Sequence, residues 1–132
     1  SELEIDFTKI PDLAQTFVVA AALLNIPFRF TGLQTLRIKE TDRIAALIKE
    51  LKKLGYDIKD KGDTEMYWNL ERVESEANPV IETYEDHRMA MALAPAAIKH
   101  PKLTVDEPMV VTKSYPTYWE DLQEIGVKVL KI

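Results

Sequence analysis

RIKETDRIAALIKELKKLG, residues 37–55, joins a charged segment to an amphipathic helix, and this combination sets the fold expected for the whole chain. A helix is predicted for its second part because a glycine ends it and apolar residues recur at helical spacing, at Ile44, Leu47, Ile48, Leu51 and Leu54. The first part, KETDR, places four charged side chains and a threonine at the helix start. These charges form either a solvated cap, with Glu40 paired to Arg43, or a site for an anion. Lys39 and Arg43 oppose the helix dipole, which a bound anion would offset.

Strands and helices are expected to alternate on both sides of this segment. A first series comprises a strand at 3–7, a helix at 11–24, a strand at 28–33, the helix at 44–54, and strands at 56–60 and 65–70. A second series comprises a strand at 78–84, a helix at 86–100, a strand at 102–107, a helix at 115–125 and a closing strand at 127–132. Pro95 should kink or shorten the helix at 86–100. Such alternation is typical of α/β proteins.

The two series carry matching residues at a constant separation. Three pairs are each 74 positions apart: Asp12 and Asp86, Lys39 and Lys113, and Pro27 and Pro101. The shared register and the shared order of elements indicate a duplicated β-α-β-α-β-β unit, with copies at 1–78 and 79–132. In such units the loops that lead into helices tend to gather at one end of the sheet. We therefore expect the charged helix starts of both copies to lie close together.

The composition indicates one compact domain or a piece of a larger one, since 46% of the 132 residues are hydrophobic and 30% are charged. A net charge of −5 argues against a general nucleic-acid binder. The absence of cysteine excludes disulfides and thiolate metal ligands, and it fits a cytoplasmic protein. The longest apolar run, residues 17–28, contains Asn25 and Pro27 and is too short to span a bilayer. The chain opens without methionine, directly in a predicted strand, which suggests an excised fragment.

Asp86, His87 and Arg88 stand at the start of an almost wholly apolar helix. Burial of that helix leaves His87 and Arg88 at an edge where they need partners. The alternative is that Asp86 caps the helix and pairs with Arg88. A metal site is disfavoured because the other histidine, His100, lies beyond the far end of the helix and no paired-histidine motif exists.

Two further helix starts carry single charged residues of interest. Lys113 is either a solvated lysine or the counterpart of Lys39 in the repeat. Asp12, in TKIPDLAQT, is typical of a plain helix cap. Four separate helix starts thus bring charged side chains that one anion-binding site could use.

Four motifs together resemble one known family. RIKETDRI, YEDHRMAMA and KSYPTYWEDL, preceded by IPDLAQT, resemble in order and spacing the C-terminal part of 5-enolpyruvylshikimate-3-phosphate synthases, over essentially the whole chain. The resemblance implies a two-domain enzyme in which each domain holds three β-α-β-α-β-β units, an inside-out α/β barrel. This chain would be about two of the three units of the second domain, without the N-terminal domain. A monomer is expected.

The reaction implied by the resemblance transfers the enolpyruvyl group of phosphoenolpyruvate to the 5-hydroxyl of shikimate 3-phosphate and releases phosphate. It belongs to the shikimate pathway to aromatic amino acids and needs no metal or organic cofactor. By this resemblance Asp12 contacts the attacking hydroxyl as base or orienter, and Glu40 is the acid/base near the methylene carbon. His87 would position the glutamate.

The same resemblance assigns the basic residues to the two anionic substrates. Lys39 would bind a substrate hydroxyl or phosphate, Arg43 and Arg88 would grip the carboxylate of phosphoenolpyruvate, and Lys113 would contact its phosphate. Thr35 departs from the family, in which many members place an asparagine that contacts the substrate ring, so that role is not carried over.

Two alternatives stay open at this point. The chain could be a relative of UDP-N-acetylglucosamine enolpyruvyl transferase, which shares the fold but has different motifs at these places. It could also be a non-catalytic α/β module that binds small anions. In the preferred interpretation the 132-residue chain alone has no turnover, because the cleft lies between two domains.

Overall fold

The computed structural model describes residues 2–131. Its first part contains, with 3-10 turns labelled η, β1 (Leu3–Asp6), η1 (Pro11–Leu13), α1 (Ala14–Leu23), β2 (Phe28–Thr31), η2 (Leu36–Ile38), α2 (Arg43–Lys53), β3 (Lys59–Lys61) and β4 (Glu65–Trp68). Its second part contains β5 (Val80–Ile81), α3 (His87–Leu93), η3 (Ala94–Ile98), β6 (Thr104–Val105), η4 (Pro108–Val111) and α4 (Tyr118–Glu124). Both parts therefore run strand, helix, strand, 3-10 turn, helix, and within residues 2–131 only the first part continues into two further strands.

Each part is built on a pair of parallel strands joined by a helix. In the first part β1 pairs in parallel with β2, and the antiparallel hairpin of β3 and β4 extends the sheet in the order β1-β2-β4-β3. In the second part β5 pairs in parallel with β6. Parallel neighbours need a long crossover, which α1 and α3 supply.

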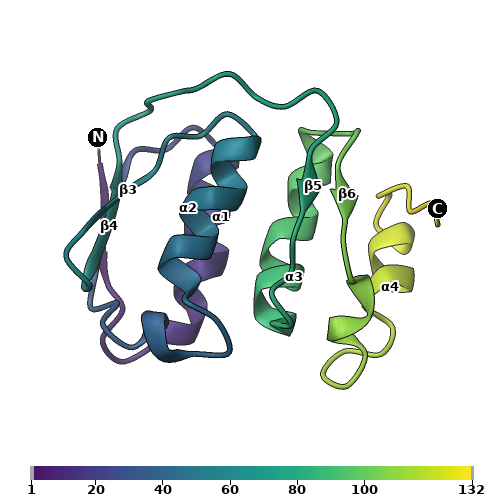
Figure 1. Cartoon of the computed structure of the whole chain (residues 1–132), viewed down its shortest axis with the longest axis horizontal. Coiled ribbons are helices and arrows are strands. Elements are labelled where there is room, and N and C mark those ends of the chain that lie inside the picture. The colour runs from purple at the N-terminus through teal and green to yellow at the C-terminus, as the bar shows by residue number, and fades with distance from the viewer. Residues whose placement is uncertain (1, 132) are drawn as a thin grey trace.

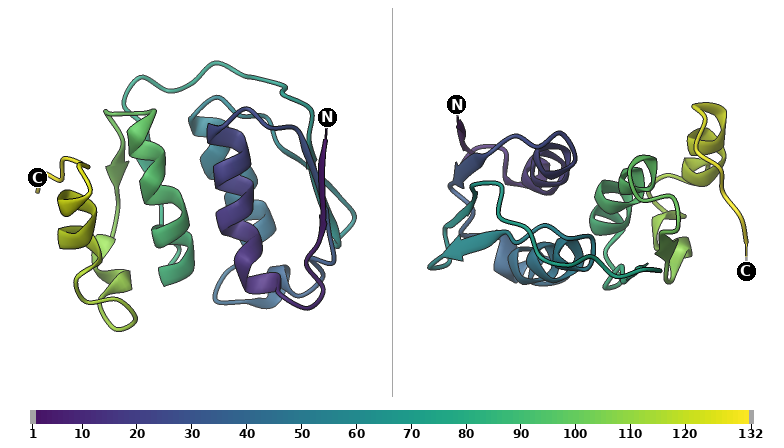
Figure 2. Two further views of the ribbon diagram at one scale, coloured as in Figure 1. Left: turned by 180° about the vertical axis from the view of Figure 1, so that it is seen from behind. Right: turned by 90° about the horizontal axis from the view of Figure 1, so that it is seen from above.

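The helices of the first part lie between its sheet and the second part. Figure 1 shows α1 and α2 beside the four-stranded sheet, then α3, and then β5, β6 and α4, and the view from above in Figure 2 has the same order. Helix α3 is apolar on two sides. Met89 and Leu93 join the core of the first part, whereas Ala90 and Ala94 pack with residues of η4 and α4. The predicted burial of this helix is confirmed, and α3 connects both cores.

Helix α2 forms as its sequence predicts. Its start is capped by Asp42, whose side chain accepts a hydrogen bond of 3.0 Å from the backbone N–H of Ala45. Gly55 follows the helix with φ of 99°, a conformation that favours glycine. The apolar stripe is buried at Ile44, Leu47, Leu51 and Leu54.

Two expectations about the later part of the chain have different outcomes. Helix α3 ends at Leu93 and continues as the 3-10 turn η3, so the predicted effect of Pro95 is confirmed. The expected closing strand is wrong for residues 127–131, which form no strand, while Ile132 lies outside the described residues. The physical reason is pairing: β3 forms against β4, whereas this segment is hydrogen bonded to α4, from the backbone N–H of Val127 to the carbonyl of Leu122 and from Gln123 Nε2 to the carbonyl of Val129.

No helix within residues 2–131 is long and apolar enough to cross a lipid bilayer.

Candidate active site

Helices α1, α2 and α3 all begin at the lower end of the molecule in Figure 1. Ion pairs join charged side chains from the segments around these helix starts. Arg43 is at the centre, with a side chain that is 1% exposed. Its Nε donates to Asp86 Oδ2 at 2.8 Å, and its Nη1 donates to Asp12 Oδ1 at 3.1 Å. Its Nη2 donates to Glu40 Oε2 at 2.7 Å and to Asp86 Oδ1 at 3.3 Å. Together with Lys39, these residues are called the Arg43 cluster below.

Asp86 is the buried anchor of this cluster. Its side chain has no exposed area, and its Oδ1 accepts hydrogen bonds from the backbone N–H groups of Arg88 (3.0 Å) and Met89 (3.3 Å). It therefore caps α3, as one interpretation of the sequence expected. Its ionic partner is Arg43 rather than the expected Arg88. The reason lies in the tertiary structure, because packing of α3 against the first part brings the Arg43 guanidinium within 2.8 Å of the Asp86 carboxylate.

Asp12 is not a helix cap, contrary to the plain interpretation of its sequence position. It lies within η1, where no side-chain cap hydrogen bond forms, and its Oδ1 is 3.3 Å from Lys39 Nζ. Partial burial acts to raise the pKa of Asp12, but the hydrogen bond and charge of Lys39 and the charges of Arg88 and Arg43 outweigh it and lower that pKa. The Asp12 carboxylate is thus held ionised among cations from several helix starts.

Arg43 is kept charged by its acidic partners. Burial acts to lower its pKa, but the hydrogen bond and charge of Asp86, followed by the charges of Glu40 and Asp12, raise it. A guanidinium presents five N–H donors in a rigid fork that matches carboxylates. The site therefore contains a buried, permanently charged group suited to a planar anion.

His87 lies beside the acidic residues. One side-chain ligand atom from each of Glu40, Asp86 and His87 lies within 4.8 Å of the others. Such a group could suggest a metal ion, but Asp86 already accepts two hydrogen bonds from Arg43 and two from backbone N–H groups. Its carboxylate is therefore already bound to a cation and to backbone donors, and the arrangement favours an imidazole beside Glu40 over a metal site.

Lys113 lies apart from these contacts. It is exposed in the turn that follows η4, and among the described residues no ion pair joins it to the Arg43 cluster. Thr35 is exposed just before η2. The structure thus brings together Asp12, Lys39, Glu40, Arg43 and His87 with the backbone of Arg88, and leaves Lys113 in solvent.

Sequence reasoning missed the buried Glu50, which lies on the same helix as Arg43 and has no exposed area. Its spacing carried a signal, because residues 43, 47, 50 and 54 share one helical face and two of them are core leucines. Arg37 was missed as well. It binds three aspartates, Asp42, Asp60 and Asp63, and so joins the start of α2 to the hairpin of β3 and β4.

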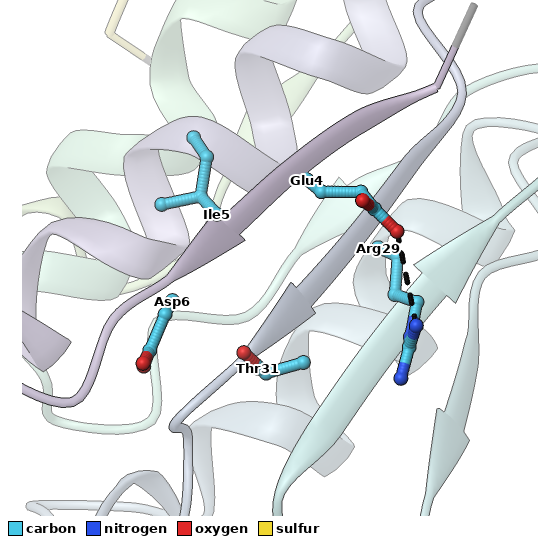
Figure 3. A pocket seen from close by; sticks show the side chains of 5 residues that line it. All are labelled: Glu4, Ile5, Asp6, Arg29 and Thr31. Carbon is cyan, nitrogen blue, oxygen red and sulfur yellow. Dashed lines mark ion pairs between the residues drawn. The ribbon is translucent and has the colours of Figure 1, made fainter.

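A pocket of about 250 Å³ lies on the other side of the four-stranded sheet and is not part of this site. Figure 3 shows its lining residues, Glu4, Ile5, Asp6, Arg29 and Thr31, with Arg29 paired to Glu4 at 3.7 Å. Arg29 and Thr31 alternate along β2 with the buried Phe28 and Phe30, so they point away from the helices.

Comparisons with known proteins agree with the motifs. Residues 2–122 match the family model of EPSP synthase (3-phosphoshikimate 1-carboxyvinyltransferase). The 3-phosphoshikimate 1-carboxyvinyltransferase of Bacteroides fragilis (strain YCH46) is 67% identical over 124 residues, which is 94% of this chain and 30% of that protein. The protein of the same name from Pseudomonas syringae pv. tomato is 36% identical over 127 residues, or 95% and 30%. A solved EPSP synthase structure from Acinetobacter baumannii has a TM-score of 0.71 at 26% identity, covering 89% of this chain and 28% of that one.

The architecture is therefore part of an enolpyruvyl transferase fold. The chain belongs to the EPSP synthase family, as its motifs indicated. It spans about 30% of the length of the curated relatives named above.

Proposed function

We propose that this chain is part of an enzyme that transfers the enolpyruvyl group of phosphoenolpyruvate to the 5-hydroxyl of shikimate 3-phosphate and releases phosphate. The observation that carries the proposal is the buried Arg43, which three carboxylates from three separate segments hold at the meeting point of the helix starts. Membership of the EPSP synthase family supports the same reaction. The shikimate pathway and a cytoplasmic location follow from it.

In this proposal the acidic residues handle protons. Asp12 orients or deprotonates the attacking hydroxyl, and its lowered pKa keeps the carboxylate ionised as a hydrogen-bond acceptor for that hydroxyl. Glu40 exchanges a proton with the methylene carbon, with His87 beside it as the positioning imidazole. No metal or organic cofactor takes part.

The basic residues bind the anionic groups. Arg43 and Arg88 hold the carboxylate of phosphoenolpyruvate, Lys39 holds a hydroxyl or phosphate of the second substrate, and Lys113 reaches the leaving phosphate. The exposed Lys113 must move toward the cluster, or a further domain must enclose it.

Substrate binding requires an exchange of partners at Arg43. Four hydrogen bonds already join its guanidinium to acidic residues, so an incoming carboxylate must replace one of them. Glu40 and Asp12 are the partners able to leave, because their side chains are 49% and 43% exposed, whereas Asp86 is fully buried. Release from Arg43 would free the Glu40 carboxyl for proton transfer.

We further propose that units 1–78 and 79–132 are two of three units in one domain, and that a second domain supplies the other side of the cleft. The intact protein would act as a monomer. This division is consistent with the chain matching about 30% of its curated relatives.

The test is a chimera in which this chain replaces the matching segment of the Bacteroides fragilis protein, 67% identical to it. It should release phosphate at a steady rate only when phosphoenolpyruvate and shikimate 3-phosphate are both present. Glu40→Gln should lower kcat at least about 100-fold, whereas Glu4→Gln, on the outer face of β1, should not. A cooperatively unfolding chimera that releases no phosphate would contradict the proposal.

A further inference from the structure

Glu50 is a buried carboxylate that reaches from α2 into the second part of the chain. Its Oε1 accepts a hydrogen bond of 3.0 Å from the backbone N–H of Glu82, and its Oε2 accepts one of 2.5 Å from the hydroxyl of Tyr84. Lys53 Nζ lies 2.7 Å from Oε1 and also donates to the carbonyl of Val80 at 2.9 Å. The carboxylate is thus fully used, although nothing in the Arg43 cluster touches it.

The segment that Glu50 holds has an unusual backbone. Tyr84 and Glu85 have φ values of 57° and 55°, in the left-handed region that residues other than glycine rarely adopt. Consecutive residues in this region persist only when their surroundings determine them. The turn leads directly into Asp86, the cap of α3.

Helix α2 therefore holds this turn at both ends. Glu50 binds it at Glu82 and Tyr84, and Arg43, two turns earlier on the same helix, binds it at Asp86. The backbone N–H groups of Arg88 and Met89 donate hydrogen bonds to Asp86, so the orientation of the Asp86 side chain determines the position of the first turn of α3. Since Glu50 and Arg43 share one helix, the distance between the two attachment points is constant.

We propose that Glu50 and Tyr84 are positioning residues that set the left-handed turn and thereby place Asp86, His87 and Arg88 at the site. Their effect on catalysis rests on the function proposed above, whereas their effect on the geometry of α3 does not. The competing explanation is that the Glu50–Tyr84 pair only fastens the two parts of the chain together.

Tyr84→Phe and Tyr118→Phe form a matched pair that separates these explanations. Tyr84 is partly buried and Tyr118 is buried, and the Tyr118 hydroxyl also makes one hydrogen bond, to the carbonyl of Met91 at 2.8 Å. Both changes remove one tyrosine hydroxyl that donates a hydrogen bond, so both should lower stability. Only Tyr84→Phe should disturb the turn that precedes Asp86.

The first measurement is amide hydrogen exchange by NMR on the 132-residue chain. Exchange at Arg88 and Met89 should accelerate at least about tenfold in Tyr84→Phe relative to Tyr118→Phe, beyond any difference in global stability. Glu50→Gln, which keeps an acceptor for Tyr84, should retain more protection than Glu50→Ala. Equal exchange rates in the two tyrosine variants would overturn the positioning role.

The second measurement is turnover in the chimera. Tyr84→Phe should reduce kcat and raise KM for phosphoenolpyruvate, together lowering kcat/KM at least about tenfold, while Tyr118→Phe leaves both near the parent values. Accelerated exchange with unchanged turnover would overturn the catalytic part of the inference. A parent chimera without enolpyruvyl transfer would instead refute the proposed function, and the exchange result would still decide the positioning of α3.

Discussion

Replacing Arg43 by methionine tests how much the buried cluster depends on its cation. The side chain of Arg43 is 1% exposed and that of Asp86 is 0% exposed, so the variant leaves a buried carboxylate without its ionic partner. Breaking such a pair typically costs 3–5 kcal/mol, and we expect about 3 kcal/mol because Asp86 keeps its two backbone N–H donors. Asp12 and Glu40 add little, since they are 43% and 49% exposed.

The assay is urea unfolding at pH 7 followed by circular dichroism, supported by thermal unfolding. A loss of about 3 kcal/mol corresponds to a fall in Tm of roughly 10 °C for a domain of this size. Arg29→Met is the matched control, because Arg29 also forms ion pairs with acidic residues, Glu4 and Glu65, but its side chain is 50% exposed. The unfolding midpoint of Arg29→Met should stay near that of the wild type.

The double variant Arg43→Met/Asp86→Asn completes the test. Removing the uncompensated charge should recover at least about 1.5 kcal/mol relative to the sum of the single changes, since the two residues are in direct contact. Strictly additive effects, or an Arg43→Met midpoint equal to that of Arg29→Met, would refute the dependence of Asp86 on Arg43.

Four further outcomes are expected. Gly32→Ala should cost about 2–3 kcal/mol in urea unfolding, because at φ of 72° an added Cβ would collide with Asp6 and Thr8, whereas Gly62→Ala, with φ of 58° and open space, should cost about 1 kcal/mol; equal losses would argue against the collision. The pKa of His100 is lowered from 6.5 by burial and then by the charges of Arg72 and Lys99, so the fold prefers the neutral imidazole and stability should fall as pH drops below that value. His100→Gln should flatten this dependence between about pH 7 and 5, and an unchanged slope would exclude His100 as its source. Lys113→Ala in the chimera should lower kcat at least about 100-fold, and a rate near that of the parent would remove this lysine from the site. The 132-residue chain alone should release no phosphate from the two substrates, so steady turnover by it would show that no second domain is required.

The alternation of elements and the start and end of α2 were predictable because their causes are local. Ile44, Leu47 and Leu51 recur at helical spacing, Asp42 caps the helix, and Gly55 ends it. The break in α3 near Pro95 has an equally local cause, since proline cannot donate the backbone hydrogen bond that an α-helix needs. The closing strand was predicted wrongly because strand formation depends on a non-local cause, the presence of a pairing partner. Residues 127–131 alternate like a strand, but a strand forms only against a partner.

The candidate site likewise has features with local causes and features that depend on contacts distant in the sequence. The sequence by itself determined which charged residues stand at helix starts, including Lys39, Glu40 and Arg43, and the repeat indicated that these starts would meet. Only the tertiary structure decided the partners, because Arg43 and Asp86 are 43 positions apart and Glu50 and Tyr84 are 34 apart. Whether a charge is solvated or buried depends on what packs over it, and packing of α3 against α1 and α2 turns charged residues of one helix into the centre of a site.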